Sequence, residues 1–367
     1  MKKVMSVFGT RPEAIKMAPL IKELEMHKEA IESVVVVTAQ HREMLDQVLD
    51  IFDITPDYDL NIMQKNQSLS QMTSRVLMQI DDILLKEQPD IVLVHGDTTT
   101  SFVAGLAAFY HQIKIGHVEA GLRTWDKMAP FPEEMNRQMT DVLSDVYFAP
   151  TELSRQNLLK QNIPDEKIYV TGNTVVDALQ QTTKMGFTHQ VVSDLKADSR
   201  KILLTMHRRE NIGEPMEQVF NAVKRVVEAD ETIEVIYPVH PNPKVKSLAK
   251  EVLGSHPQIH LIEPLDVVGF HNCMSQVDLI LSDSGGVQEE APSLKKPVLV
   301  LRDSTERPEG IETGILKVVG TEEEKVYKEI THILNNSEVY NKVTNQPNPY
   351  GDGHASQKIV EILYNII

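Results

Sequence analysis

The sequence predicts an α/β protein built from two Rossmann-like domains, each with a parallel sheet. Short apolar runs, typical of strands buried on both faces of a sheet, alternate along the chain with amphipathic stretches of helical period. This alternation implies βαβ units with right-handed crossovers. It restarts after a polar stretch near the middle, and a length of 367 residues suits two domains better than one.

Strand candidates recur in both halves of the chain. In the first half they are Val4–Phe8, Val34–Thr38, Ile91–Val94, Ile115–Val118, Val146–Ala149 and Ile168–Val170. In the second half they are Ile202–Met206, Ile233–Tyr237, Ile259–Ile262, Leu279–Ser282, Val298–Leu301 and Leu316–Val319. Amphipathic helices fit between them, for example over Ala14–Met26, Leu69–Lys86 and Glu217–Ala229.

The polar stretch from Gln180 to Arg200 is predicted to be the linker region, and Asp57–Asp59 a loop. We expect an N-terminal Rossmann-like domain over residues 1–171 and a C-terminal one over 172–353. Residues 354–367 are amphipathic and are predicted to form a terminal helix that packs back on the N-terminal domain. A cleft between two such domains is a preferred ligand site.

Composition narrows the class of protein. The formal net charge of −16 argues against nucleic acid or an anionic membrane surface as the main partner. No apolar run approaches the roughly 18 residues of a membrane helix. The apolar start is too short for a signal peptide, and the single cysteine, Cys273, excludes an internal disulfide. We therefore expect a cytoplasmic protein.

Carboxylates follow two of the predicted strands. Asp97 comes just after Ile91–Val94, and Glu119 just after Ile115–Val118. Ligands of parallel sheets bind beyond the carboxyl ends of the strands, so both side chains lie where chemistry is expected. A third acidic cluster contains Glu133. Several carboxylates in one cleft favour acid/base work or stabilisation of a developing positive charge.

Two turn-and-helix motifs predict anion binding. In Gly9-Thr-Arg-Pro-Glu13, Arg11 and the nearby Lys16 are placed to face an anion at a helix N-terminus. The alternative is an ordinary helix start with solvated charges. The glycines after Ser284 are predicted to expose backbone N–H groups to a nucleotide diphosphate. Glu290, further along the helix, is placed to accept hydrogen bonds from ribose hydroxyls. The alternative there is a simple helix cap.

Basic residues follow two further strands of the second half. His207 and Arg208 come after Ile202–Met206, where a histidine is a candidate proton carrier or phosphate donor. Arg307 follows Val298–Leu301 and is a candidate phosphate clamp; a surface ion pair is the alternative. The chain has no dinucleotide fingerprint, no Walker motif and no His/Cys metal spacing, so no metal and no cofactor is expected.

These motifs resemble one family over nearly the whole chain. They are Gly9-Thr-Arg-Pro-Glu13, His95-Gly-Asp97-Thr, His117-Val-Glu119-Ala-Gly-Leu-Arg123, Pro132-Glu-Glu-Met-Asn-Arg137, Thr171-Gly-Asn173, His207-Arg-Arg-Glu-Asn211, Ser282-Asp-Ser-Gly-Gly286 and Arg302-Asp-Ser-Thr-Glu-Arg-Pro308. Their order and spacing are similar to those of the bacterial non-hydrolysing UDP-N-acetylglucosamine (UDP-GlcNAc) 2-epimerases. The resemblance implies the glycosyltransferase-B fold and reversible conversion of UDP-GlcNAc to UDP-N-acetylmannosamine (UDP-ManNAc), for surface polysaccharide synthesis. It also implies a homodimer.

The resemblance further implies a mechanism and a set of residues. UDP leaves by anti elimination, giving 2-acetamidoglucal, and then adds back. Carried over by position, the catalytic residues are Asp97, Glu119, Glu133 and His207, and the choice of Glu133 over Glu134 rests on register alone. The substrate-binding residues are Arg11, Lys16, Arg137, Phe270, Ser284, Gly285, Gly286, Glu290 and Arg307. One family position, often a glutamine that contacts uracil, is Leu265 here.

Family members are also activated by their own substrate, UDP-GlcNAc, bound at a second site. Gln40, His41, Arg208 and His240 are the candidate contacts, with packing or exposed-loop roles as the alternative. Three other functions remain open at this point: a glycosyltransferase of the same fold that uses a UDP-sugar, a hydrolysing epimerase, and a UDP-sugar sensor. The three carboxylates favour the epimerase over the transferase and the sensor.

Overall fold

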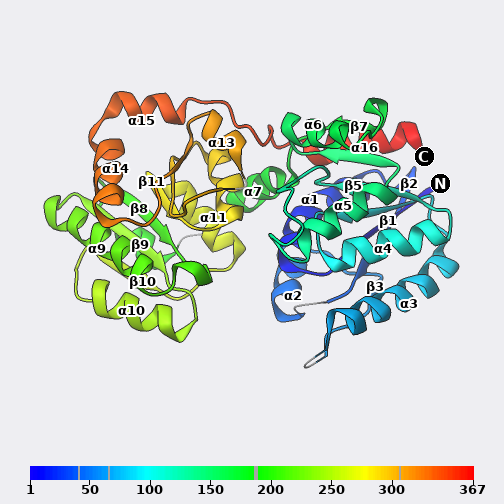
Figure 1. Ribbon diagram of the computed structural model, residues 1–367, viewed down its shortest axis with the longest axis horizontal. Coiled ribbons are helices and arrows are strands. Elements are labelled where there is room, and N and C mark those ends of the chain that lie inside the picture. Colours follow the sequence, from blue (N-terminus) through cyan, green and yellow to red (C-terminus); the bar gives the residue numbers. More distant parts are fainter. Residues whose placement is uncertain (40–41, 65–66, 186–188, 306) are drawn as a thin grey trace. The chain divides into compact units, whose positions relative to one another are not determined.

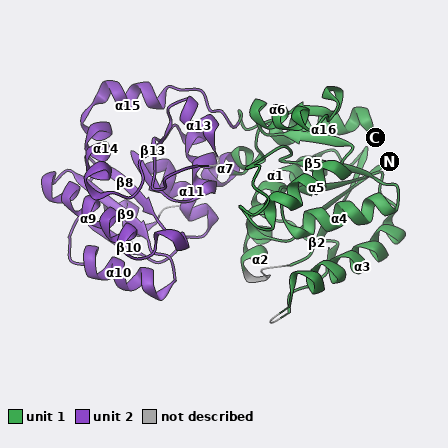
Figure 2. Ribbon diagram, in the orientation of Figure 1, with its two compact units in different colours: residues 1–178, 351–367 green, residues 179–350 purple. Residues whose placement is uncertain are grey.

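The computed structural model describes residues 1–39, 42–64, 67–185, 189–305 and 307–367. Two compact units make up the chain (Figure 2). Unit 1 holds residues 1–178 and 351–367, and unit 2 holds residues 179–350. The first division falls inside the helix Thr174–Lys184 (α7), seven residues after the predicted boundary at residue 171. The second falls after residue 350, where residue 353 was expected.

Unit 1 contains a parallel sheet of seven strands in the order β3-β2-β1-β4-β5-β6-β7 (Figure 1). The strands are Lys2–Phe8 (β1), Ile31–Val37 (β2), Tyr58–Asp59 (β3), Ile91–His95 (β4), Lys114–Val118 (β5), Val146–Ala149 (β6) and Ile168–Val170 (β7). The prediction of a loop at residues 57–59 is wrong, because Tyr58 and Asp59 pair with Val36 and Val37 of β2. A strand of two residues is too short for an alternation to be visible in the sequence.

Helices cover both faces of this sheet. They are Arg11–Met26 (α1), Arg42–Ile51 (α2), Leu69–Glu87 (α3), Thr99–Tyr110 (α4), Glu133–Leu143 (α5), Glu152–Lys160 (α6), the start of α7, and Ala355–Ile366 (α16), with a short 3₁₀ turn at Asp165–Lys167. Met5 and Val7 of β1 pack in one core cluster with α3 and α4. Val4 and Phe8, on the alternate face, are equally buried, as strands inside a doubly wound sheet should be.

The chain returns to unit 1 at its C-terminal end. The predicted terminal helix is present as α16, which packs against α1. Asp177 of α7 accepts the backbone N–H groups of Ala355 (3.2 Å) and Ser356 (2.8 Å). A carboxylate at the start of a helix satisfies donors that have no partner within the helix. This contact anchors residues 351–367 to unit 1.

Unit 2 contains a parallel sheet of six strands in the order β10-β9-β8-β11-β12-β13. The strands are Arg200–Thr205 (β8), Ile233–Pro238 (β9), Ile259–Ile262 (β10), Leu279–Ser282 (β11), Val298–Val300 (β12) and Leu316–Val318 (β13). The helices are Gln190–Asp194 (α8), Glu214–Ala229 (α9), Pro243–Leu253 (α10), Val267–Gln276 (α11), Gly285–Glu290 (α12), Pro308–Glu312 (α13), Glu323–Asn335 (α14) and Ser337–Thr344 (α15), with 3₁₀ turns at Arg209–Asn211 and Ala291–Leu294.

Each of the predicted strands is present within one or two residues of its predicted ends, except that β2 begins at Ile31, three residues before the predicted start at Val34. The predicted linker at residues 180–200 is partly wrong, because α7 continues to Lys184 and α8 occupies Gln190–Asp194. Their composition is polar, but backbone hydrogen bonding within a helix does not require an apolar face along its whole length.

The strand orders create one switch point in each sheet. In unit 1 the chain leaves β1 toward β2 on one side and later returns to β4 on the other, so β1 and β4 are neighbours. In unit 2 β8 and β11 are neighbours in the same way. Loops that leave such a pair of strands diverge and open a crevice at the carboxyl edge of the sheet. Arg11 and Asp97 follow the switch-point strands of unit 1, and His207 and Ser284 follow those of unit 2, whereas Glu119 and Arg307 follow the next strands, β5 and β12.

Candidate functional site

One buried carboxylate ties together the two loops at the switch point of unit 1. Glu13, the third residue of α1, accepts the backbone N–H groups of Gly9 (3.0 Å) and Thr10 (2.7 Å). Its other oxygen accepts the hydroxyls of Thr98 (2.6 Å) and Ser101 (3.0 Å), which follow β4. Burial raises the pKa of Glu13. The turn after β1 and the turn after β4 are therefore fixed relative to each other.

The two predicted basic residues of α1 differ in their contacts. Arg11 is the first residue of the helix and is partly exposed. Its guanidinium makes no hydrogen bond or ion pair with any residue of the described chain. Lys16, one turn further, forms an ion pair with Glu119, and its side chain is only 12% exposed. Arg11 is thus available to an anion at this helix N-terminus, where backbone N–H groups also favour negative charge.

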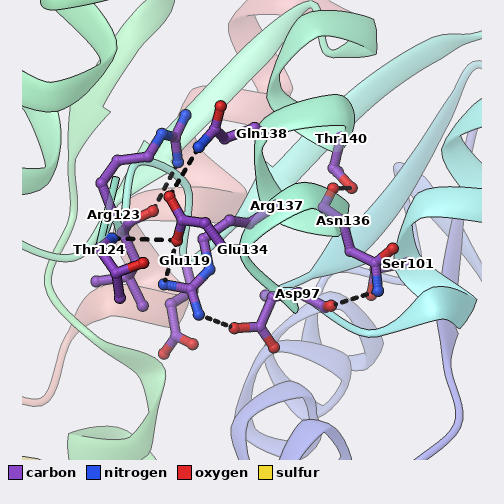
Figure 3. A network of polar contacts seen from close by, with 12 residues as sticks. Asp97, Ser101, Glu119, Arg123, Thr124, Glu134, Asn136, Arg137, Gln138 and Thr140 are labelled. Atoms are coloured by element: carbon purple, nitrogen blue, oxygen red, sulfur yellow. Dashed lines mark hydrogen bonds and ion pairs between the residues drawn. The ribbon is translucent and has the colours of Figure 1, made fainter. Parts of the chain in front are cut away.

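Asp97 lies beside Arg137 (Figure 3). Nη2 of Arg137 donates to Oδ2 of Asp97 at 2.5 Å, and Nδ2 of Asn136 donates to the Asp97 carbonyl at 3.0 Å. Burial raises the pKa of the Asp97 carboxyl; Arg137 opposes that change, and the neighbouring Glu119 adds to it. A carboxylate whose charged form is disfavoured in this way is a better proton acceptor than a solvated one.

Glu119 has a strained backbone and a closely held side chain. Its φ angle is +66°, in the left-handed region, which costs a residue with a side chain about 1–3 kcal/mol. Lys16 donates to Oε2, and Nδ2 of Asn173 donates to the same oxygen at 3.0 Å. Strain of this kind persists where the surrounding contacts enforce it, and here they aim the carboxylate toward the Asp97 region.

The adjacent residues Glu133 and Glu134 have different environments. Glu134 is fully buried and accepts a hydrogen bond from the backbone N–H of Thr124 at 3.1 Å (Figure 3). It accepts a second from the backbone N–H of Trp125, also at 3.1 Å. Glu133 makes no hydrogen bond with the described residues, and its charge contributes to the raised pKa of Asp97. Successive residues of a helix point about 100° apart, so the two carboxylates have different surroundings. Glu134 is held by the loop after β5 and by Arg137, at 3.4 Å, whereas Glu133 acts on Asp97 through its charge.

The buried side chain of His117 contacts the backbone of the loop that carries Asp97. Nε2 of His117 lies 2.7 Å from the Gly96 carbonyl, and its Nδ1 lies 2.6 Å from Asp141. A carbonyl oxygen only accepts, so Nε2 carries a proton. Asp141 also accepts from Arg123 at 2.5 Å; although burial opposes it, contact with His117 and Arg123 lowers the pKa of Asp141. This chain of contacts fixes the peptide next to Asp97.

In unit 2, the buried carboxylate of Asp283 organises the loop after β8. It accepts the backbone N–H groups of His207 (3.0 Å) and Arg208 (2.9 Å) and the side-chain amide of Asn211 (3.0 Å). Asp283 is completely buried, whereas the His207 side chain is 40% exposed. The ring of His207 also stacks on that of His240, with centroids 5.6 Å apart. His207 is therefore presented to solvent by a rigid support.

The glycine turn after β11 forms an open cradle. Gly285 and Gly286 begin α12, so their N–H groups have no partner inside the helix. A Cβ atom at Gly285 would meet only Nη2 of Arg208, at 3.8 Å. The guanidinium of Arg208 thus lies over the turn. Backbone donors and an arginine beside them suit a phosphate group.

Two carboxylates at the far end of α12 are paired with basic side chains. Glu290 lies 3.6 Å from Nε2 of the buried His271, whose Nδ1 is 2.7 Å from the hydroxyl of Thr182. Buried Glu289 accepts from Nε of Arg307 at 2.5 Å. Arg307 is therefore engaged in an ion pair, and its side chain is 15% exposed.

Comparison with known proteins gives these loops a context. The family model described as UDP-N-acetylglucosamine 2-epimerase matches residues 22–364. The chain belongs to this family. It is 57% identical over 361 residues to the UDP-N-acetylglucosamine 2-epimerase of Bacillus subtilis, covering 98% of this chain and 94% of that protein. The chain is therefore an isomerase, a non-hydrolysing UDP-GlcNAc 2-epimerase of the bacterial kind.

Solved structures agree with this assignment. The UDP-GlcNAc 2-epimerase from Neisseria meningitidis bound to UDP-GlcNAc has a TM-score of 0.90 and 50% identity, covering 99% of this chain and 100% of that one. The S. aureus MnaA–UDP co-structure has a TM-score of 0.89 and 53% identity, covering 100% and 98% of the two chains. Both units are parallel-sheet α/β units of the glycosyltransferase-B type, as the sequence predicted.

The predicted site residues of this 2-epimerase fall into two groups. Unit 1 brings together Lys16, Asp97, Glu119, Glu133 and Arg137, with Arg11 on the helix that carries Lys16. Unit 2 brings His207 and Arg208 to the turn at Ser284–Gly286. Phe270 lies on α11, partly buried against the core of unit 2.

The candidates for a second site are only partly placed. Gln40 and His41 lie outside the described residues. His240 is exposed and stacks on His207; the partial burial of its ring, and then the proximity of His207, lower its pKa. Arg208 lies at the glycine turn, next to the residues predicted for the diphosphate.

Several side chains that shape the site were not among the predicted residues of this 2-epimerase. Asn173, Asp283 and Glu13 each stand inside a motif that the sequence analysis quoted, but none was given a role. His271 had no such signal. Their roles depend on contacts between residues far apart in the chain, such as the 54-residue separation between Asn173 and Glu119.

Two further properties concern the described residues alone. None of their helices combines the length and the apolar character needed to cross a membrane. No three or more of their His, Cys, Asp or Glu side chains are grouped so as to hold a metal ion.

Proposed function

We propose that the chain interconverts UDP-GlcNAc and UDP-ManNAc by anti elimination of UDP and re-addition through 2-acetamidoglucal. The observation that supports this most is the cluster of Asp97, Glu119 and Glu133 on the loops of one sheet, with burial raising the pKa of Asp97. Inversion at C2 by elimination needs proton transfer at carbon, which positioned carboxylates with raised pKa values perform. The reaction needs no redox cofactor.

A carboxylate takes the hydrogen from C2 as a proton, the C–H electron pair becomes the second bond between C1 and C2, and the C1–O bond breaks with its electrons on UDP. Re-addition reverses these changes with the proton delivered to the opposite face of C2. Proton removal from one face of C2 and delivery to the other require two proton-transfer groups. Asp97, Glu119 and Glu133 are the proposed candidates for these two roles. Lys16 and Arg137 orient two of them.

Unit 2 is proposed to supply the groups that hold the leaving UDP. The N–H groups of Gly285 and Gly286, the Ser284 hydroxyl and the side chain of His207 offer hydrogen bonds to the diphosphate. Arg11 and Arg307 add positive charge, which stabilises the diphosphate as its charge develops. Glu290 is proposed to accept ribose hydroxyls and Phe270 to contact the uracil base.

Product analysis with UDP-GlcNAc as the sole substrate tests this function. The proposal expects UDP-ManNAc, with the nucleotide sugar conserved through many turnovers. A UDP-sugar-dependent glycosyltransferase would leave UDP-GlcNAc unepimerised without an acceptor, and a hydrolysing epimerase would accumulate free ManNAc and UDP.

We further propose that the enzyme works in the cytoplasm as a homodimer and supplies ManNAc units for bacterial surface polysaccharide.

We also propose that UDP-GlcNAc activates the enzyme at a second site near Gln40, His41, Arg208 and His240. The stacking of His240 on His207 supports this idea, because a ligand that contacts His240 would also act on a proposed catalytic residue. Such coupling requires only that the second molecule bind one conformation more tightly than the other.

A further inference from the structure

His95 is a buried imidazole that nothing in the mechanism above uses. It is the last residue of β4, two positions before Asp97, and it is 3% exposed. Neither of its ring nitrogens has a hydrogen-bond partner among the described residues. A buried polar group left without a partner costs about 1–3 kcal/mol of stability, so its presence here calls for a functional reason.

The groups that face His95 come from α1 and from β5 with the loop that follows it. Glu119, after β5, is the nearest: its Oε2 lies 3.9 Å from Nε2 of His95. Lys16 of α1 and His117 of β5 are the other titratable groups that act on the ring. Burial lowers the pKa of His95 to about 4, so the ring is neutral at physiological pH and carries one N–H donor and one acceptor nitrogen.

The Glu119 carboxylate beside His95 is paired with Lys16, and Lys16 also lies close to where the substrate anion is proposed to bind. Lys16 belongs to the helix whose N-terminus also carries Arg11, the side proposed to receive the negative charge of the substrate. An ammonium group next to a diphosphate or nucleotide sugar would share its charge between that anion and Glu119. The hydrogen bond from Lys16 to Glu119 would then weaken while substrate is bound, when the orientation of the Glu119 carboxylate determines proton transfer.

We propose that His95 is a positioning residue for Glu119, whose Nε2–H becomes a donor to the Glu119 carboxylate when Lys16 turns toward the bound anionic substrate. The inference rests on the proposed function, because that function supplies the anion. The two atoms must approach by about 1 Å to reach ordinary hydrogen-bond distance, which a small side-chain adjustment provides. A neutral imidazole suits this task, since it brings no net charge that would compete with Lys16.

The proposal predicts a particular pattern in two variants. His95→Leu removes the donor at similar volume and should lower kcat about 10- to 100-fold, the effect of one lost hydrogen bond to a charged group, with KM little changed. A carboxylate that loses a donor is protonated more readily, so the acid limb of the kcat profile should move to higher pH. His95→Gln, whose amide N–H can replace Nε2–H, should restore most of kcat and the wild-type acid limb.

A matched control is available in His111, which pairs with Asp81 at the end of α4. His111→Leu should leave kcat and its pH profile unchanged. If His95→Leu turns over like the wild type, or if His95→Gln is as impaired as His95→Leu, the proposal is overturned.

A measurement on the wild type keeps the test valid even if a variant fails to fold. NMR of protein labelled with ¹⁵N at histidine should show the Nε2–H proton of His95 moving to a hydrogen-bonded shift when UDP is added to saturation. An unchanged signal at saturating UDP contradicts the proposal. Failure of the wild type to form UDP-ManNAc would instead contradict the proposed function, and the NMR signal separates the two failures because it requires only UDP binding.

Discussion

The guanidinium of Arg137 donates to the Asp97 carboxylate at 2.5 Å, and the two side chains come from α5 and the loop after β4. Burial raises the pKa of Asp97 while Arg137 limits that rise. The pair therefore sets the pH at which Asp97 becomes a base. A base of this kind works only when ionised, so activity that depends on it falls as the pH drops through its pKa.

Asp97→Asn should lower kcat by at least about 10²-fold, the usual effect of removing an acid/base group. The amide keeps the shape of the side chain, so UDP affinity and thermal stability should stay close to those of the wild type. Turnover is measured by NMR of the nucleotide sugars, and UDP affinity by calorimetry. Near wild-type turnover would remove Asp97 from the mechanism.

Arg137→Gln should move the acid limb of the kcat profile to higher pH. Burial raises the pKa of Asp97, and Arg137 is the larger of the two groups that oppose it; without Arg137 only Lys16 remains. Glutamine retains an amide donor, so the loop should stay in place. A full pH series in both reaction directions measures the shift, and an acid limb that stays in place or moves to lower pH would show that Asp97 does not control it.

Glu133→Ala and Glu134→Ala form a matched pair. Glu133→Ala should lower turnover by at least about 10²-fold with the free energy of unfolding unchanged, because this side chain makes no hydrogen bond with the described residues. Glu134→Ala leaves the N–H groups of Thr124 and Trp125 without their acceptor and should lower the free energy of unfolding by about 2 kcal/mol or more. Urea titrations measure the second quantity. The reverse pattern would transfer the catalytic role to Glu134.

Gly285→Val should weaken UDP binding while the fold persists. A Cβ atom at Gly285 meets only Arg208, at 3.8 Å, so the added side chain occupies the space proposed for phosphate without a clash. Arg208→Ala should weaken binding by about 1.5–3 kcal/mol, the range for a hydrogen bond to a charged group. Arg225→Ala, which removes an arginine paired with Glu323 and Glu324 on α14, is the matched control. Unchanged UDP affinity in both test variants would refute the proposed cradle.

Self-activation predicts a sigmoidal dependence of rate on UDP-GlcNAc concentration. UDP-ManNAc alone should be converted slowly until some UDP-GlcNAc is added. His240→Ala should make the curve more hyperbolic, since it removes a proposed second-site contact that stacks on His207. Hyperbolic kinetics of the wild type in both directions would rule out the second site.

The sequence was sufficient for the strands of the described chain other than Tyr58–Asp59, and for the loops that carry the chemistry. Asp97 and Glu119 follow continuous apolar runs, and such runs identify buried parallel strands whose carboxyl ends bear ligands. The strand Tyr58–Asp59 was missed because two edge residues carry no periodicity. The helix α7 was partly missed because its later residues are polar.

The contacts inside the site could not be predicted in the same way. Glu133 and Glu134 are adjacent and chemically identical, so only their orientation on α5 separates a buried, hydrogen-bonded carboxylate from one whose charge acts on Asp97. The positive φ of Glu119 and the lack of partners of His95 within the described chain arise from tertiary packing. The sequence motifs indicated which loops form the site, and the distances between side chains indicate what each residue in them contacts.

NMR of UDP-GlcNAc with the pure protein in D₂O tests the central proposal most directly. Elimination and re-addition predicts UDP-ManNAc with deuterium at C2, because a carboxylate that holds the abstracted proton exchanges it with solvent before re-addition. Small amounts of free UDP and 2-acetamidoglucal should also accumulate during slow turnover, most visibly in the Asp97→Asn and Glu133→Ala variants. UDP-ManNAc that retains its original hydrogen at C2, with no trace of the glucal, would contradict this account.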